Sequence, residues 1–244
     1  MAYGSFVIQR DLTFDVNHGD IFVIMGGSGC GKSTLLKHML GLIEPADGDI
    51  LYDGSSFVHA TASAREAMRR NWGITYQSGG LFSAMTLAEN ISLPLQLYTR
   101  FNKAEIEDVV AYKLALVGLA GYQAYYPSEI SGGMRKRAAL ARAIALDPQI
   151  LFFDEPSAGL DPISSPLLDE LIVQLKESID ATVVMVTHEL PSIFAIASNS
   201  VYLDNSSRTM IAYGPPETLR DTSDQAVVRQ FLTRSAKTPG EEPT

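Results

Sequence analysis

Residues 21–33 spell IFVIMGGSGCGKS, an apolar run that passes through a glycine-rich loop into a lysine and a serine. The run at residues 21–25 is short, uncharged and ended by glycines, which predicts a buried strand. Residues 32–42 then place four apolar side chains on one side of a helix. A strand, a glycine loop and a helix in this order match G-x-x-x-x-G-K-[ST], a pattern typical of loops that cradle phosphate groups.

The composition of this loop has a physical reason. Glycines let backbone N–H groups turn inward around an anion, and the following helix points its positive end at the same place. Lys32 is expected to reach the β- and γ-phosphates of a nucleotide, and the Ser33 hydroxyl to coordinate Mg²⁺. The alternative is an ordinary glycine-rich turn, which the flanking strand and helix disfavour. The predicted nucleotide-binding residues are Gly26, Gly27, Ser28, Gly29, Cys30, Gly31, Lys32, Ser33 and Thr34.

Composition limits the classes of protein to consider. The chain has 244 residues, enough for one large domain with its own core, and its formal net charge of −9 argues against broad nucleic-acid binding. A single cysteine, Cys30, excludes an internal disulfide and suits a reducing compartment. Neither a signal peptide nor an apolar run long enough for a membrane span is visible, so we expect a cytoplasmic protein held at a membrane by other chains.

Strand and helix patterns alternate along the rest of the chain, which predicts an α/β fold with a mostly parallel sheet. A largely helical stretch at residues 86–119, with breaks at Pro94 and residues 99–102, predicts an inserted helical subdomain. We expect a single domain over residues 1–234, with a core lobe at 1–76 and 147–234, a helical lobe at about 77–146, and a disordered tail at 235–244. Further strands are predicted at residues 49–52, 72–76, 150–153, 182–187, 201–203 and 209–212, and further helices at 132–145, from 161, from 191 and at 224–234.

Two acids follow the apolar residues 150–153. Successive side chains on a strand point opposite ways, so Asp154 can face a metal while Glu155 faces an attacking water. We therefore assign Asp154 to the magnesium shell and Glu155 to the general base or to positioning of the water. Acids at a strand end are often only solvated, and the phosphate loop upstream disfavours that alternative here.

Residues 131–137, SGGMRKR, open another predicted helix. Backbone N–H groups at this start again suit a phosphate. Here the chain resembles the ABC (ATP-binding cassette) ATPase family, whose signature is L-S-G-G-Q. The resemblance covers about residues 3–220, with the family's motifs in the family's order. Ile130 and Met134 replace the leucine and the glutamine of the signature and leave Ser-Gly-Gly intact.

Four single residues take their roles from this resemblance. Gln77 stands at the Q-loop glutamine, Asp161 in the D-loop SAGLD, His188 at the switch histidine, and Tyr3 at the aromatic residue that stacks on adenine. The resemblance implies that His188 contacts the γ-phosphate, and that Gln77 contacts the metal and links the nucleotide to a transmembrane partner. Without the resemblance, each of these four residues would be read as an ordinary surface or packing residue. The family usually has a strand before the adenine aromatic, whereas this sequence begins almost at Tyr3.

The resemblance also implies ATP and Mg²⁺ as cofactors, an ABC-type cassette fold and a head-to-tail homodimer. In such a pair, Ser131, Gly132 and Gly133 of one chain close over ATP that the other chain holds, and hydrolysis opens the dimer. The predicted catalytic residues are Lys32, Gln77, Glu155 and His188, and the predicted metal ligands are Ser33, Gln77 and Asp154.

Within the family, residues 131–143 and 154–163 resemble the ATPases of Mla-type systems, which work with proteins carrying mammalian-cell-entry domains and move phospholipids. This implies an integral-membrane permease, a substrate-binding protein of the mammalian-cell-entry type, a small regulatory subunit, and a place on the cytoplasmic face of a bacterial inner membrane. The apolar residues near Phe82 would receive the permease, or else belong to the core.

Other functions remain as alternatives. An importer of another small solute is the first. A DNA-repair or chromosome-type ABC protein is the second, although the long coiled coils and zinc-binding cysteines of such chains are not visible here. An inactive scaffold is the third, and Lys32, Glu155 and His188 argue against it. Cys30 lies close to Lys32 and a helix start, where a thiol can be unusually acidic, or it is simply a small filler.

Overall fold

The computed structural model describes residues 1–3, 6–77 and 79–234. Ser78 of the predicted Q-loop and the tail at 235–244, predicted to be disordered, lie outside the described residues. The side chain of Tyr3, expected to stack on adenine, lies outside them as well. Its backbone is described, and a short antiparallel ladder joins β1 (Ala2–Tyr3) to β2 (Phe6–Val7).

A six-stranded sheet forms the centre of the described chain, in the order β10-β9-β3-β8-β7-β6. Neighbouring strands from β9 to β6 are parallel, and β10 at one edge is antiparallel to β9. This confirms the predicted α/β fold with a mostly parallel sheet. The strands are β3 (Ile21–Gly26), β6 (Trp72–Thr75), β7 (Ile150–Asp154), β8 (Thr182–Val186), β9 (Asn199–Asp204) and β10 (Thr209–Gly214).

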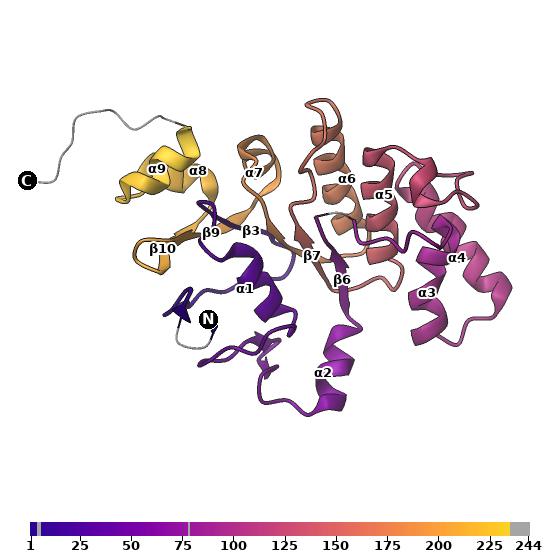
Figure 1. Cartoon of the computed structure of the whole chain (residues 1–244), viewed down its shortest axis with the longest axis horizontal. Helices are drawn as coiled ribbons and strands as arrows, with labels where there is room; N and C mark the ends of the chain where they lie inside the picture. Colours follow the sequence, from indigo (N-terminus) through magenta and orange to yellow (C-terminus); the bar gives the residue numbers. More distant parts are fainter. Residues whose placement is uncertain (4–5, 78, 235–244) are drawn as a thin grey trace, which may run out of the picture.

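Helices cover both faces of this sheet and extend beyond its β6 edge (Figure 1). One face carries α1, the other carries α6 and α7, and α3, α4 and α5 form a group beside β6. The helices are α1 (Lys32–Met39), α2 (Ala62–Arg69), α3 (Leu87–Tyr98), α4 (Lys103–Leu116), α5 (Gly132–Ala143), α6 (Ser164–Ser178), α7 (Leu190–Ile196), α8 (Pro216–Thr222) and α9 (Ala226–Thr233), with a 3₁₀ turn at Pro127–Glu129.

Successive side chains of the central strands fill two separate cores. Phe22 of β3 and Phe152 of β7 pack on the face that α1 covers. Val23 and Phe153, one residue further along the same strands, pack on the opposite face with α5 and α6. Because both faces are covered, these strands are apolar along their length, which is the pattern that predicted them.

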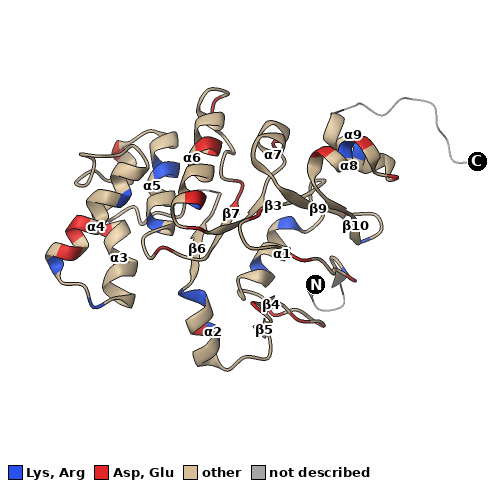
Figure 2. Ribbon diagram, turned by 180° about the vertical axis from the view of Figure 1, so that it is seen from behind, with Lys and Arg blue, Asp and Glu red and all other residues tan. Residues whose placement is uncertain are grey.

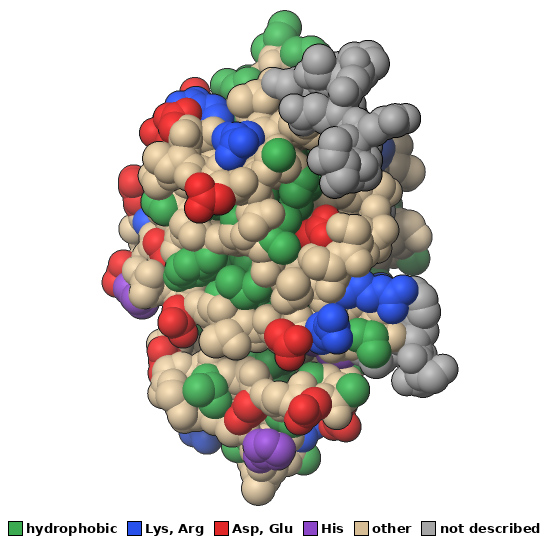
Figure 3. Space-filling model, turned by 90° about the vertical axis from the view of Figure 1, so that its left-hand side faces the viewer, with side chains coloured by type: hydrophobic (Ala, Val, Ile, Leu, Met, Phe, Trp, Pro, Cys, Tyr) green, Lys and Arg blue, Asp and Glu red, His purple; other side chains and the backbone are tan. Residues whose placement is uncertain are grey.

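The N-terminal segment covers the β10 edge of the sheet. The Arg10 N–H donates to the Arg208 carbonyl at 2.9 Å, and the Tyr213 hydroxyl donates to the Asp15 carbonyl at 2.9 Å. Figure 3 views this end of the molecule, where hydrophobic side chains lie in bands between charged ones; Tyr213 and Val227 are each 40% exposed. An edge strand covered in this way is less open to pairing with another chain.

Pro94 does not break its helix, contrary to the expectation above. Thr86 and Glu89 form a capping box at the start of α3, and the helix buries Leu87, Ile91 and Leu95. These contacts outweigh the single N–H that Pro94 lacks. The break expected at residues 99–102 is present, and Asn102 caps the start of α4.

The region between α1 and β6 also differs from the expectation. Instead of one strand at residues 49–52, a hairpin joins β4 (Leu51–Tyr52) to β5 (Ser55–Ser56), and Asp53 and Gly54 turn the chain with positive φ of 50° and 73°. Helix α2 was not predicted from the sequence, because its eight residues are mostly small or charged and none of them is buried. Helix α8 was not predicted either, because seven residues are too few to show a helical period.

No helix within residues 1–3, 6–77 and 79–234 combines the length and the apolar character that crossing a membrane requires.

Candidate nucleotide-binding site

The loop between β3 and α1 needs glycine at particular positions. Gly26 and Gly31 have φ of 147° and 99°. A Cβ on Gly26 would lie 2.3 Å from the Leu203 carbonyl oxygen, and one on Gly31 would lie 2.7 Å from Ile8. Within the described residues no side chain caps the first turn of α1, so its N–H groups face the loop and can bind an anion.

The Lys32 side chain folds back over this loop. Its ammonium donates to the carbonyls of Gly26 at 3.0 Å and Gly27 at 2.9 Å, and the side chain remains partly exposed. A cation is thereby held beside the N–H groups of the loop, where an anion would lie. Ser28 and Gly29 complete the loop with exposed positions, and Thr34 follows in the first turn of α1.

Ser33 and Asp154 meet although they lie 121 residues apart. The Ser33 hydroxyl donates to the Asp154 carboxylate at 3.1 Å, which joins the first turn of α1 to the carboxyl end of β7. A hydroxyl and a carboxylate are hard oxygen ligands of the kind that Mg²⁺ prefers next to phosphate. The two predicted ligands are therefore close enough to share one ion.

Glu155 is held in an unusual backbone conformation directly after β7. Its φ is 51°, and its N–H donates to the Val186 carbonyl at 2.8 Å. One carboxylate oxygen, Oε1, lies 2.8 Å from Nδ1 of His188, which is exposed at the end of β8. The other, Oε2, is buried and has no hydrogen-bond partner among the described residues. A buried, unpartnered acceptor beside the phosphate loop is where a water would be held, so these residues fit a nucleotide with Mg²⁺.

The residues expected to act across a dimer lie apart from this group. Ser131 caps α5 with its hydroxyl on the Met134 N–H at 3.2 Å, and Gly132 and Gly133 form the first turn. Helix α5 packs beside β6, which is three strands from β3 in the sheet. At a spacing of ~4.8 Å per strand, that is about 14 Å. Ser131 and the loop at Gly26 are thus not neighbours within one chain.

Asp161 and Gln77 have local surroundings in the single chain. The Asp161 carboxylate accepts the N–H groups of Ile163 and Ser164, each at 3.0 Å. These bonds lie in the turn before α6, which begins at Ser164 and not at residue 161 as expected. Gln77 is exposed just after β6, so its side chain is accessible to a ligand.

Burial changes the chemistry of Cys30. The Cys30 side chain is fully buried, and burial raises the pKa of its thiol, while the charge of Lys32 opposes this. The possibility of an unusually acidic thiol is therefore wrong, and the alternative of a small filler side chain agrees with the structure. Cys30 can contribute to anion binding only through its backbone.

Two residues that hydrogen-bond to the backbone of the site were not predicted from the sequence. Gln9 is completely buried, and its amide donates to the carbonyls of Cys30 at 2.8 Å and Asp204 at 2.9 Å. Lys136 of α5 donates to the carbonyl of Pro156, next to Glu155. Gln9 carries no sequence signal, because a lone glutamine is typical of a surface. Lys136 stands in the basic run of residues 135–137, whose contacts only the fold reveals.

Comparison with known proteins gives three concordant results. A family model described as "ABC transporter" matches residues 9–158. The chain is 43% identical to the "Probable ribonucleotide transport ATP-binding protein mkl" of Mycobacterium leprae over 95% of this chain and 66% of that protein. It is 39% identical to the "Intermembrane phospholipid transport system ATP-binding protein MlaF" of Haemophilus influenzae over 97% of this chain and 88% of that protein. The chain thus spans just under two thirds of the length of the mycobacterial relatives.

Solved structures with the same fold include ATP-binding cassettes. One is the dimeric MJ0796 cassette in a post-hydrolysis state with ADP and Pi, with a TM-score of 0.75 and 27% identity over 84% of this chain and 89% of that chain. Another is cbiO1 from Clostridium perfringens, part of the ABC transporter complex cbiONQ, with a TM-score of 0.79 and 25% identity over 93% of this chain and 88% of that chain. Each of these structures superposes on most of the described sheet and helices.

Proposed function

Because this chain belongs to the ABC transporter family of ATP-binding proteins, we propose that it hydrolyses ATP as the motor subunit of a membrane transporter. The observation that supports hydrolysis most is the surroundings of Glu155. Its buried Oε2 lacks a partner in the part of the chain that the structure describes, its Oε1 is fixed by His188, and the Ser33–Asp154 pair stands beside it. An inactive scaffold would have no need for this arrangement.

Each residue has a defined task in this proposal. Bound ATP with Mg²⁺ would supply a phosphoryl group open to attack by water and a metal that neutralises its charge. Lys32 and the N–H groups from Gly26 to Thr34 bind the phosphates, and Ser33, Asp154 and Gln77 hold the metal. Glu155 holds the water and accepts its proton at Oε2, while His188 keeps the carboxylate oriented.

The second half of the proposed site comes from another copy of the chain. Ser131, Gly132 and Gly133 start a helix whose Gly132 and Gly133 N–H groups would bind an anion, but they lie three strands from the loop of their own chain. A head-to-tail homodimer would bring them onto the partner's ATP, with Asp161 nearby and Tyr3 stacked on adenine. The neighbouring MJ0796 cassette is described as dimeric.

For the cargo we propose phospholipid or another hydrophobic molecule of the bacterial envelope. The MlaF relatives, which are named for phospholipid transport, align with 87–88% of their own length. The mkl relatives, named for ribonucleotide transport, are slightly more similar but align over less of theirs. In this scheme the partners are a permease, a substrate-binding protein of the mammalian-cell-entry type and a small regulatory subunit, at the cytoplasmic face of the inner membrane.

Hydrolysis and cargo can be tested on one preparation. The tagged chain is purified from detergent-solubilised membranes with its co-purifying proteins, and phosphate release is measured. We expect Glu155→Gln to lower the rate by about 100-fold or more, because it removes the proton acceptor. Glu177→Gln, an exposed acid on α6, is the matched control and should match the wild type. Equal rates for the wild type and Glu155→Gln would indicate a scaffold.

Mass spectrometry of the same preparation addresses the cargo. Enrichment of phospholipid with a co-purifying permease supports the lipid proposal. A bound ribonucleotide other than ATP or ADP would indicate ribonucleotide transport instead. Another bound small solute would indicate transport of that solute.

A further inference from the structure

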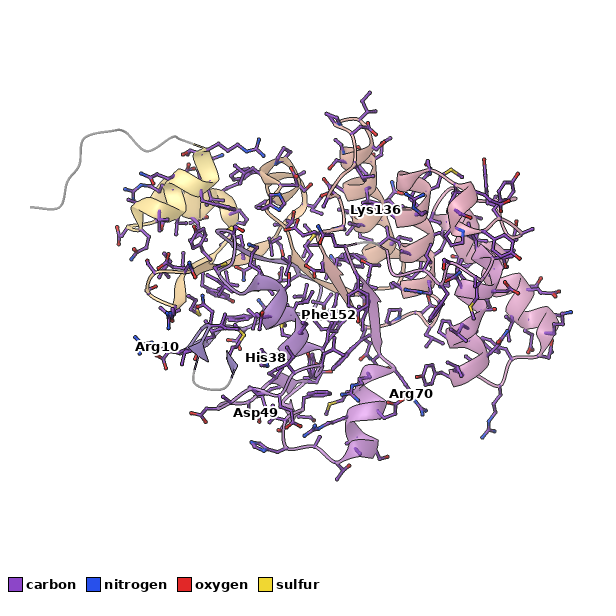
Figure 4. All side chains as sticks on the ribbon, in the orientation of Figure 1. Arg10, His38, Asp49, Arg70, Lys136 and Phe152 are labelled. Atoms are coloured by element: carbon purple, nitrogen blue, oxygen red, sulfur yellow. The ribbon has the colours of Figure 1, made fainter. Side chains whose placement is uncertain are left out.

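Lys136 connects the signature helix to the backbone of the proposed catalytic acid. It lies on α5, one helical turn after Gly132. Its ammonium donates to the carbonyl of Pro156 at 2.5 Å and to that of Glu155 at 3.5 Å. Figure 4 labels Lys136 where α5 approaches the end of β7 and α6, and Figure 2 shows the basic residues of α5 in the same region.

The backbone that receives this contact is strained. Glu155 is not glycine and has a φ of 51°, in the left-handed region that side chains disfavour. Its N–H is held by Val186, and its carbonyl accepts the Ala158 N–H at 3.2 Å. The first contact comes from the neighbouring strand β8, and the second closes the turn that follows β7. Lys136 adds a contact from the helical group beside β6.

The Lys136 ammonium also lies in a position where a charge costs free energy unless it has hydrogen-bond partners. Lys136 lines a small hollow together with Tyr76, Gly79 and Pro156, so residues from both sides of Gln77 meet the signature helix there. Burial lowers the pKa of Lys136, and the negative charge of Glu155 opposes that shift. A half-buried ammonium that donates hydrogen bonds to two backbone carbonyls is expected to fix the position of that backbone.

We propose that Lys136 is a positioning residue that ties the signature end of α5 to the backbone of Glu155 in the same chain. The inference rests on the proposed function and goes beyond it. Residues 131–133 would touch the partner's ATP, whereas Glu155 acts on the chain's own ATP. Because α5 is a continuous helix, engagement of the signature at one site would reposition Glu155 at the other. Lys136 thereby links the two ATP sites of the dimer.

The first test separates hydrolysis from binding. In the complex purified from membranes, Lys136→Met keeps the hydrophobic stem and removes the donor. We expect kcat to fall by about ten-fold or more, KM for ATP to stay within about two-fold, and the Hill coefficient for ATP to approach one. Lys136→Arg, which keeps a donor, should recover part of kcat. Lys103→Met, on the exposed start of α4, is the control and should match the wild type.

The second test asks whether Lys136 acts through Glu155. In the Glu155→Gln background, Lys136→Met should lower the residual rate by less than about two-fold, because residues that act as a unit are not additive. The ATP-bound dimer of Glu155→Gln should form equally well with and without Lys136→Met. A full additional loss of rate, or loss of that dimer, would assign Lys136 to the signature or to folding and overturn the proposal.

The outcomes also separate this inference from the proposed function. If the wild type hydrolyses ATP and Lys136→Met matches it in kcat and in Hill coefficient, only the role of Lys136 is wrong. If the wild type and Glu155→Gln have equal rates, the proposed function itself fails.

Discussion

At the scale of single residues, glycine suits two positions of the phosphate loop for different physical reasons. Gly26 has a positive φ and lies against the Leu203 carbonyl and the Cys30 sulfur. The position of a Cβ on Gly27 is open: apart from the adjoining residues, no atom of the described chain lies within 4 Å of it. One glycine is therefore required by the fold, and the other leaves room for the ligand.

This difference predicts unequal effects of two substitutions on the stability of the nucleotide-free protein. Gly26→Ala should lower the free energy of unfolding by about 2 kcal/mol or more, because its Cβ would overlap backbone and the φ is unfavourable. Gly27→Ala should change it by less than about 0.5 kcal/mol. Urea unfolding without nucleotide measures both. Equal losses of unfolding free energy in the two variants would show that the residues around Gly26 shift to accommodate the added Cβ at little cost.

Another residue-scale prediction concerns Asp169, which is buried between α6 and α7. Burial raises the pKa of its carboxyl, the charge of Glu189 adds to this, and the Ser192 hydroxyl opposes it. An acid whose pKa is raised by folding favours the folded state below its unfolded pKa, and that benefit is lost as the pH rises through the folded pKa.

We therefore expect Asp169→Asn to be most favourable at alkaline pH. It should raise the free energy of unfolding by about 1 kcal/mol near pH 8, and by less near pH 4, since more of the buried carboxyl is then protonated. Thermal unfolding across this pH range tests it. A gain that is independent of pH would show that the carboxyl does not titrate with folding.

At the scale of elements, α3 organises the loop that precedes it. Asn90 is completely buried, and its side chain accepts the N–H of Phe82 at 2.8 Å and donates to the carbonyls of Phe82, Met85 and Thr86. A single amide thus sets the shape of residues 82–86. This loop carries Phe82, which is 50% exposed, whereas Leu87 after it belongs to the core.

Removing this amide should cost more than a surface substitution. Asn90→Ala is expected to lower the free energy of unfolding by about 2–4 kcal/mol, because several backbone groups lose their partner. Asn90→Asp should be at least as damaging, since a carboxylate brings oxygen toward carbonyl oxygens and has no N–H to donate. Chemical denaturation of the two variants, with Asn102→Ala as a cap-only comparison, measures the order.

At the scale of the whole molecule, the two helix starts proposed to bind phosphate lie in different parts of the sheet order. The loop before α1 follows β3, and α5 packs beside β6. Sites that cannot meet within one chain can meet between two chains that are arranged head to tail.

ATP should therefore act as the link between two copies. Glu155→Gln is expected to form a dimer in saturating Mg-ATP with its permease present, and adding Ser131→Arg should abolish the dimer because the arginine fills the space of the phosphate. Light scattering coupled to size exclusion measures the mass. A monomer for Glu155→Gln under these conditions would exclude the proposed sandwich.

The exposed side chain at Phe82 gives a prediction for coupling to the membrane partner. Phe82→Glu should leave folding intact and reduce transport per ATP hydrolysed, because a charge replaces an apolar contact with the permease. Transport and hydrolysis are measured together in reconstituted vesicles. Transport at the wild-type ratio would show that Phe82 does not contact the permease.

Local sequence patterns predicted the central strands of the sheet and the motifs that follow them. Residues 21–25 and 150–153 are uniformly apolar because both faces of the sheet are covered, and the glycine loop ending in Lys32-Ser33 and the pair Asp154-Glu155 come directly after them. Local patterns are sufficient for such elements. They were insufficient for α2 and the β4–β5 hairpin, which bury little, and for Pro94, where packing of α3 outweighs the local preference.

Which distant groups meet depends on the fold and could not be predicted from the sequence. Ser33 reaches Asp154, His188 reaches Glu155, Gln9 supports Cys30, and Lys136 touches the backbone beside Glu155. The order of parallel strands sets these contacts, and strand order is a property of how the whole chain packs rather than of any single segment. The same packing raises the pKa of Cys30, which its sequence neighbours alone would lower.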